Sequence, residues 1–266
     1  MAPEHKERPA DSAARVLNDV RQFLQDERSM FGENLITTTQ NLSGRESMTK
    51  NSAGKPQETE LFDQLPSPAS EPWISARDLP ELNSAICQCM KCSLGESRTK
   101  FVFGVGNPDA SLLIIGEAPG ADEDRQGEPF VGRAGQLLNK ILEAIQFRRE
   151  DVFICNILKC RPPNNRAPVA EEVEQCIPYL RKQISLVRPK VILCLGLVAA
   201  GHLLGSRESL SRLRGKVHSY ENTPVMVTYH PAALLRNPNW KRPAWEDVQA
   251  VRKLHDELVA QSSAKE

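Results

Sequence analysis

A glycine-rich segment that joins a buried strand to an amphipathic helix constrains the fold of this chain more than any other feature. It spans residues 116–135 and reads GEAPGADEDRQGEPFVGRAG, and the apolar run 112–115 before it has the length of a buried strand. Apolar residues at helical spacing follow, namely Leu137, Leu138, Ile141, Leu142 and Ile145. Glycines let a ligand approach the main chain closely, and ligands of open α/β sheets bind beyond the carboxyl ends of strands. We therefore expect a ligand site in this segment.

Side chains within the segment favour a ligand site over a plain tight connection. Glu117, Glu123 and Asp124 supply carboxyl groups, and Phe130 is an aromatic residue among small ones. A connection that only turns the chain needs none of these side chains.

Strands and helices alternate through the rest of the chain. Apolar runs predict strands over residues 101–105, 112–115, 152–157, 191–195 and 225–229. Helical spacing predicts helices over residues 79–86, 137–145, 169–187 and 196–204, and from Trp245 onward. This alternation predicts a largely parallel sheet covered by helices on both faces.

The first 72 residues differ from the remainder in charge and composition. They contain 8 Lys and Arg against 12 Asp and Glu, whereas the whole chain of 266 residues has 34 of each, so the remainder is mildly basic. Residues 11–28 have the spacing of a short amphipathic helix, and residues 29–71 have the composition of a disordered linker. We expect an acidic extension over residues 1–72 and one catalytic-size domain over residues 73–266.

Composition limits the classes of function only weakly. The mild positive charge of residues 73–266 permits nucleic-acid binding, although any globular surface can carry such an excess by chance. No apolar segment approaches membrane-spanning length, and the N-terminus lacks the pattern of a secretory signal. We expect a cytoplasmic protein with no membrane partner.

Four of the seven cysteines have the arrangement of a ligand set. Cys89 and Cys92 form C-x-x-C, and Cys160 and Cys176 lie far along the chain in a proline-rich loop and the next helix. Four thiolates from distant segments can enclose one metal centre, and spacing alone leaves zinc and an iron-sulfur cluster equally open. Cys155 and Cys194 lie inside strand patterns and fit ordinary buried thiols.

Several separated motifs together resemble one known family. GEAPG, EDRQGEPFVGRAGQLLNKIL, NILKCRPPNNRAP and HPAALLRNP follow one another as in the family 4 (iron-sulfur, type-4) uracil-DNA glycosylases, and the resemblance runs from about residue 80 to the end. It implies an α/β three-layer sandwich with a central, largely parallel four-stranded sheet. It also implies a [4Fe-4S] cluster on Cys89, Cys92, Cys160 and Cys176, with Cys87 left over.

The resemblance implies an enzyme that flips uracil out of DNA and hydrolyses its N-glycosidic bond, leaving an abasic site. Phe130 would stack on the base, the amide of Asn156 would read N3-H and O4, and His230 would donate to O2 as negative charge develops. The backbone of Glu117 and Ala118 would approach the base. Glu117 and Glu123 join His230 and Asn156 as expected catalytic residues, and Glu123 or Asp124 would orient water or shape the pocket.

Two further residues are implied for DNA binding. Leu234 would fill the space that the flipped nucleotide leaves, and Arg236 would contact a phosphate. We expect a monomer that acts on single- or double-stranded uracil-containing DNA, with the N-terminal extension recruiting a repair or replication partner. Ala118 stands where the family 1 enzymes have a water-orienting Asp, so the water-orienting residue is left open.

Two other activities compete with this interpretation. A non-catalytic iron-sulfur DNA-binding or polymerase-associated protein of the same fold would not need Phe130, Asn156 and His230. The relative that traps uracil-DNA covalently carries a nucleophilic histidine in an inserted basic loop, and no histidine lies between Cys160 and Cys176.

Overall fold

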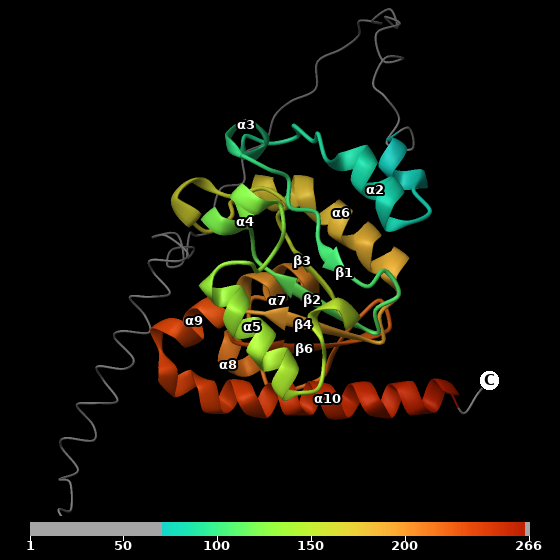
Figure 1. The fold of residues 1–266 in the computed structure, drawn as a ribbon, viewed down its shortest axis with the longest axis vertical. Coiled ribbons are helices and arrows are strands. Elements are labelled where there is room, and N and C mark those ends of the chain that lie inside the picture. Colours follow the sequence, from blue (N-terminus) through green and yellow to red (C-terminus); the bar gives the residue numbers. More distant parts are fainter. Residues whose placement is uncertain (1–70, 264–266) are drawn as a thin grey trace, which may run out of the picture. The chain divides into compact units, whose positions relative to one another are not determined.

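The structure is a computed structural model that describes residues 71–263, and these form a six-stranded sheet with helices on both faces (Figure 1). The strand order is β1-β3-β2-β4-β6-β5. The inner strands β3, β2, β4 and β6 are parallel, and the edge strands β1 and β5 are antiparallel to their neighbours. The strands are β1 (Val105–Gly106), β2 (Leu112–Gly116), β3 (Phe153–Asn156), β4 (Val191–Leu195), β5 (His218–Tyr220) and β6 (Thr223–Thr228).

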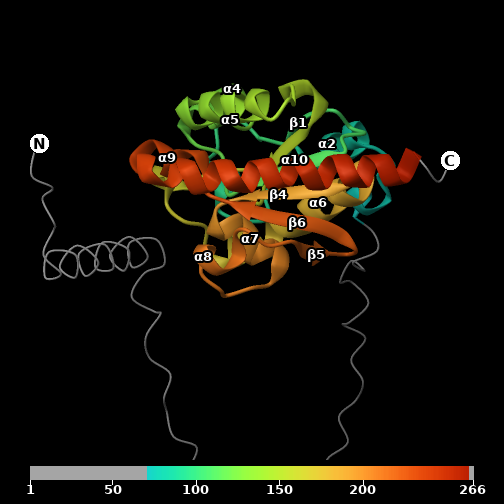
Figure 2. The same cartoon turned by 90° about the horizontal axis from the view of Figure 1, so that it is seen from below.

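Helices connect the strands, and the longest of them lies along one face of the sheet (Figure 2). The α-helices are α2 (Leu79–Ile86), α3 (Leu94–Ser97), α4 (Ala121–Gln126), α5 (Arg133–Ala144), α6 (Ala170–Val187), α7 (Leu197–Leu204), α8 (Leu210–Leu213), α9 (Pro231–Arg236) and α10 (Lys241–Ser263). Short 3-10 turns are η3 (Pro72–Ser75), η4 (Arg149–Asp151), η5 (Pro163–Asn165) and η6 (Pro238–Trp240).

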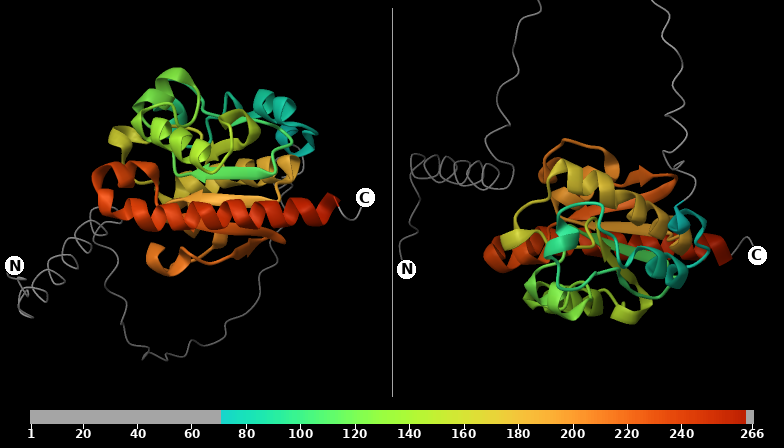
Figure 3. Two further views of the ribbon diagram at one scale, coloured as in Figure 1. Left: turned by 60° about the horizontal axis from the view of Figure 1, so that its bottom comes forward. Right: turned by 90° about the horizontal axis from the view of Figure 1, so that it is seen from above.

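Alternate side chains of the strands separate the core into two layers, one on each face of the sheet. Figure 3 shows the helices that cover the two faces. In β2, Leu113 and Ile115 pack with residues of α2, α6 and α7, whereas Leu112 and Ile114 pack with residues of α5 and α10. All four side chains are buried. The expected three-layer α/β arrangement is therefore confirmed.

The sheet has two strands more than the four that the resemblance implies. The four inner strands match the expected parallel sheet, and the additions are the short edge strands β1 and β5. The expected strand over residues 101–105 is reduced to β1. Val102 N instead donates to Lys159 O (2.8 Å), so this segment lies beside the loop that follows β3.

Several helices differ from the sequence-based expectation, and two of these differences have a clear local cause. The glycine-rich segment contains α4, whose sequence ADEDRQ is polar on every side and so carries no helical apolar pattern. The last helix begins at Lys241, before Trp245, because its first turn is also polar and contains Pro243, which is tolerated there.

The acidic extension lies almost entirely outside the described residues. The expected helix over residues 11–28 and the linker over 29–71 thus stay predictions, with only Glu71 and Pro72 inside the described part. Within residues 71–263, no helix has the length and apolar character needed to cross a membrane.

Candidate functional site

The carboxyl ends of the four parallel strands meet at one edge of the sheet, and the segments after them form the candidate site. The register places Gly116 of β2 opposite Asn156 of β3, and Leu195 of β4 opposite Thr228 of β6. This edge therefore collects the glycine-rich segment, the end of β3 and the turn that carries His230.

Asn156 presents a buried amide oxygen with no hydrogen-bond partner. The residue is 2% exposed, and its Oδ1 is one of two buried side-chain N or O atoms without a partner among residues 71–263. An unpaired buried acceptor is costly, so in a native protein it requires a partner such as a ligand or a water, or a functional role. The acceptor of Asn156 is thus available for a donor on a bound molecule.

Phe130 and Gly116 lie against this amide. A Cβ on Gly116 would overlap with Asn156 Oδ1 and lie 2.6 Å from the ring of Phe130, so only glycine fits between them. Phe130 has φ +54°, a left-handed conformation that is rare for a bulky residue and typical of functional loops. The absence of a side chain at Gly135 permits it, because a Cβ there would overlap with the Phe130 carbonyl.

Glu123 holds the glycine-rich segment in shape. Its carboxylate accepts from the backbone N–H groups of Gly120 (3.1 Å), Val131 (2.9 Å) and Gly132 (3.0 Å). Asp124 is buried and accepts from Thr99 N at 2.8 Å. Of the two roles expected for these carboxylates, the contacts support shaping of the pocket.

Arg149, in the turn η4 before β3, also holds the glycine-rich segment in place. It donates to the carbonyl of Pro129 (2.5 Å) and to Asn139 Oδ1 in α5 (3.1 Å). Sequence analysis missed this residue because an arginine in a polar turn has no distinguishing pattern.

His230 faces Phe130 and is held as a neutral donor. The ring centroids of the two residues are 5.5 Å apart, with an interplanar angle of 30°. Burial, with a further contribution from the charge of Arg236, lowers the pKa of His230 to about 4. Its Nδ1 accepts from Ala232 N (3.1 Å), so the proton of the neutral ring is on Nε2. His230 is therefore a neutral hydrogen-bond donor through Nε2.

Glu117 and Arg236 lie at the same edge. Burial raises the pKa of Glu117, and the charge of Arg236 partly opposes this rise. Arg236 also acts on His230, so its guanidinium lies within electrostatic reach of both side chains while remaining exposed. Ala118, expected beside the base, is partly buried in the first residues after β2. The structure thus brings these expected residues together.

The two leucines of α9 differ in what they can contact. Leu234, expected to fill the space of the flipped nucleotide, is only 2% exposed, whereas Leu235 is 40% exposed. The side chain that α9 offers to a molecule at the surface is therefore that of Leu235.

A buried ion pair anchors the strand that leads to His230. Asp247 of α10 accepts from Thr228 Oγ1 (2.8 Å) and receives two hydrogen bonds from Arg214, each 3.0 Å long. The guanidinium of Arg214 also lies 5.2 Å from the ring centroid of Tyr229. These contacts join α10 to the end of β6 immediately before His230.

The four expected cysteine ligands lie within electrostatic reach of one another. Burial raises the pKa of Cys160 to about 11, and the neighbouring Cys92 and Cys89 add to this rise. Burial raises the pKa of Cys176 to about 12, with Cys160 and Cys89 adding to it. Within residues 71–263, no three or more His, Cys, Asp or Glu side chains are arranged as a site for a single metal ion.

Three of these thiols receive hydrogen bonds from residues that sequence analysis missed. Tyr179 Oη donates to Cys89 Sγ (3.3 Å), Arg98 Nη1 to Cys160 Sγ (3.5 Å), and Lys159 N to Cys176 Sγ (3.3 Å). Arg98 also donates to the carbonyls of Cys87 (3.3 Å) and Cys89 (2.5 Å). No sequence pattern marks these partners, because the contacts join segments distant in sequence.

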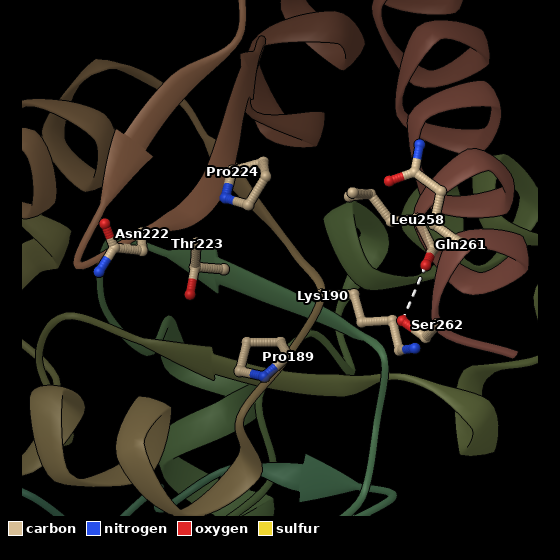
Figure 4. Close-up of a pocket in the computed structure, with 8 residues that line it drawn as sticks. All are labelled: Pro189, Lys190, Asn222, Thr223, Pro224, Leu258, Gln261 and Ser262. Carbon is tan, nitrogen blue, oxygen red and sulfur yellow. Dashed lines mark hydrogen bonds between the residues drawn. The ribbon is translucent and has the colours of Figure 1, made fainter. Parts of the chain in front are cut away.

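A hollow of about 290 Å³ lies away from this site, where β4 and β6 begin (Figure 4). Lys190, Thr223 and Leu258 are among its lining residues, and the wall from α10 contains a hydrogen bond from Ser262 Oγ to Leu258 O (3.0 Å). None of the expected site residues lines it.

Comparisons with known proteins agree with the geometry. The sequence model of the Uracil DNA glycosylase superfamily matches residues 103–249. A type-4 uracil-DNA glycosylase of Archaeoglobus fulgidus is 45% identical over 184 residues, covering 66% of this chain and 92% of the relative. A type-4 uracil-DNA glycosylase of Pyrobaculum aerophilum is 48% identical over 169 residues, covering 60% of this chain and 86% of the relative. One of Sulfurisphaera tokodaii is 41% identical over 185 residues, covering 66% of this chain and 84% of the relative.

Proposed function

The chain belongs to the uracil-DNA glycosylase superfamily and, within it, to the type-4 enzymes, and we propose that it excises uracil from DNA with Asn156 reading the base. Water adds to C1′ of the deoxyribose while the bond to uracil N1 breaks, which leaves an abasic site and free uracil. The observation that carries this assignment is the buried, unpaired Oδ1 of Asn156.

Asn156 distinguishes uracil from cytosine by the direction of its hydrogen bonds. Its Oδ1 accepts from uracil N3-H, and its amide N–H donates to O4. Cytosine has an acceptor at N3 and a donor at N4. Asn156 Oδ1 would therefore face an acceptor, and its amide N–H would face a donor. A site built to pair a substrate polar group rejects an analogue that leaves its own buried groups unpaired.

His230 stabilises the leaving group. Uracil departs as an anion whose charge is shared with O2, and a preorganised donor at that oxygen lowers the barrier. The Nε2–H of His230 supplies this donor, since Nδ1 is engaged by Ala232 N. The low pKa of His230, about 4, keeps the ring neutral near pH 7.

Phe130 and the first residues after β2 complete the pocket for the base. The Phe130 ring, tilted against His230, offers a face on which the extruded uracil stacks. Glu117 and Ala118 bring main chain to the edge of the base, while Glu123 holds the segment that carries Phe130. Exposed Leu235 and Arg236 then face the DNA, with Arg236 contacting a phosphate.

We also propose that Cys89, Cys92, Cys160 and Cys176 hold a [4Fe-4S] cluster. The electrostatic contacts among the thiols support the fit: Cys89 and Cys92 act on Cys160, and Cys89 and Cys160 act on Cys176. Hydrogen bonds to sulfur from Tyr179, Arg98 and Lys159 suit cluster thiolates. When bound, the cluster cross-links the turn before α3 to the loop after β3.

The cluster is tested by metal analysis and spectroscopy of the purified protein. We expect a brown protein with iron and acid-labile sulfide, and Cys160→Ser should lose colour, thermal stability and DNA affinity together. Cys87→Ser is the matched control, because Cys87 lies beside the same turn and outside the ligand set. A colourless protein with stoichiometric zinc would overturn the assignment.

The activity is tested with labelled uracil oligonucleotides followed by alkali, which cleaves the strand at an abasic site. Wild-type protein should cleave the uracil strand and leave matched cytosine and thymine strands intact. Asn156→Ala should lower single-turnover excision by roughly 10- to 200-fold or more, with non-specific DNA affinity nearly unchanged because phosphate contacts supply most of it. Wild-type excision by Asn156→Ala would make Asn156 a structural turn residue.

A further inference from the structure

Lys159 places a polar amino group in the interior between the uracil-reading residue and the cysteine ligands. The side chain is 0% exposed and is among the largest fully buried ones of the described residues. Its Nζ donates to the main-chain carbonyl of Asn156 (2.8 Å) and to Gln183 Oε1 of α6 (2.5 Å). Gln183 in turn donates to the carbonyl of Phe103 (2.9 Å). The amino group of Lys159 thus holds three segments in one fixed arrangement.

The backbone of Lys159 joins the same arrangement to the thiols. Its N–H donates to Cys176 Sγ (3.3 Å), its carbonyl accepts from Val102 N (2.8 Å), and Cys160 follows it directly in the chain. One residue therefore contacts both the proposed cluster ligands and the main chain of Asn156.

A residue that only filled this space would be apolar, because burying a polar group is costly unless it is hydrogen-bonded. The amino group of Lys159 also fixes the carbonyl of Asn156, and with it the peptide plane from which the Asn156 side chain projects. Since Asn156 Oδ1 has no partner of its own within the described residues, its position depends on the support of its main chain.

We propose that Lys159 is a positioning residue that holds Asn156 in its base-reading orientation and links that orientation to the cysteine ligands. This inference rests on the proposed function. Lys159 acts through Asn156 and does not contact the base.

A double-mutant cycle on single-turnover uracil excision tests this inference, using Lys159→Met, Asn156→Ala and the double variant in the cluster-loaded, full-length protein. Lys159→Met should lower the rate roughly 10- to 100-fold, as expected when a reacting group is misplaced. In the Asn156→Ala background the same change should alter the rate less than about threefold, because residues that act as one unit are not additive. Visible absorbance and duplex affinity should be retained.

Two further variants control for charge and folding. Lys140→Met removes an exposed lysine from α5 and should leave the rate unchanged. If Lys159→Met fails to fold, Lys159→Met combined with Gln183→Leu replaces the amino group and its side-chain acceptor together, an exchange that can be nearly neutral for stability.

The outcomes separate the inference from the proposed function. A wild-type protein that does not excise uracil would overturn the proposed function, and with it the inference about Lys159. An active wild-type protein whose Lys159 and Asn156 effects multiply in the double variant would overturn the inference alone, as would a Lys159→Met protein of wild-type rate.

Discussion

Gly116 and Asn156 stand opposite each other at the ends of β2 and β3, and the space between Gly116 and the amide of Asn156 is too small for a methyl group. The same missing side chain lets the Phe130 ring approach β2. The glycine is thus a steric requirement of the pocket as well as the end of a strand.

Gly116→Ala should lower uracil excision by about 100-fold or more, because the new methyl group displaces both Asn156 and Phe130. Single-turnover assays measure the loss. Gly201→Ala is the control: Gly201 lies in α7 away from the site, and its Cβ would meet only Ser206 O at 3.2 Å. Equal activity of the two variants would contradict the packing described for Gly116.

Asn156→Asp should change the base that the pocket accepts. A carboxylate cannot donate to uracil O4, so uracil excision should fall by roughly 10- to 200-fold. The same carboxylate accepts from cytosine N4-H, and cytosine excision should become measurable. Excision from matched uracil and cytosine oligonucleotides measures both effects. Asn156→Ala is the control, because its side chain can neither donate to nor accept from the base. Loss of uracil activity without any gain on cytosine would contradict the hydrogen-bond assignment.

His230 should make the folded state less stable as the pH falls from 6.5 to 4. The unfolded histidine, with a pKa of about 6.5, binds a proton in this range, while burial keeps the folded one neutral down to about pH 4. The stability gained from the neutral ring is complete above about pH 6.5 and is lost as the pH approaches 4.

Thermal melting of wild type and His230→Asn from pH 4 to 7 measures this contribution. The variant should show a weaker dependence of stability on pH in that window, since asparagine does not titrate. Parallel curves for the two proteins would show that His230 titrates alike in the folded and unfolded states.

Leu234 and Leu235 should have separable roles. Leu235→Ala removes an exposed side chain from α9 and should lower excision from duplex DNA roughly tenfold, with a smaller effect on single strands, since unstacking a duplex base costs a few kcal/mol. Leu234→Ala removes a buried one and should lower the free energy of unfolding by about 2 to 5 kcal/mol. Chemical denaturation and duplex kinetics distinguish the two. A duplex-specific defect confined to Leu234→Ala would instead support the expectation drawn from the sequence.

The strong apolar runs made the parallel sheet predictable. Residues 112–115 and 191–195 are buried on both faces of the sheet, so they read as continuous apolar segments. Parallel strands then place their carboxyl ends at one edge, which brings together Asn156 and His230, the two residues expected from the family resemblance. The edge strand β5 escaped prediction because three residues carry no periodic signal, and β1 overlaps the expected strand over residues 101–105 only at Val105.

Contacts that depend on the packing of distant segments could not be predicted. The sequence around Lys159 shows a lysine after an apolar strand, where solvent exposure is the ordinary expectation. In the structure Lys159 is buried beneath α6, and its Nζ donates to Gln183 Oε1 of that helix, 24 positions along the chain. Arg98 similarly reaches Cys160 over 62 positions. Local patterns carry no information on such pairs.

The imidazole of His230 has a second task, as the cap of α9. Ala232 N donates to its Nδ1 (3.1 Å), and Ala233 N donates to its carbonyl (2.8 Å), so the helix that carries Leu235 and Arg236 begins on the proposed catalytic ring. Hydrogen bonds in such a chain polarise one another. As the departing base gains negative charge and accepts from Nε2–H, Nδ1 becomes a stronger acceptor for Ala232 N. A substitution at His230 therefore acts on the start of α9 as well as on the departing base.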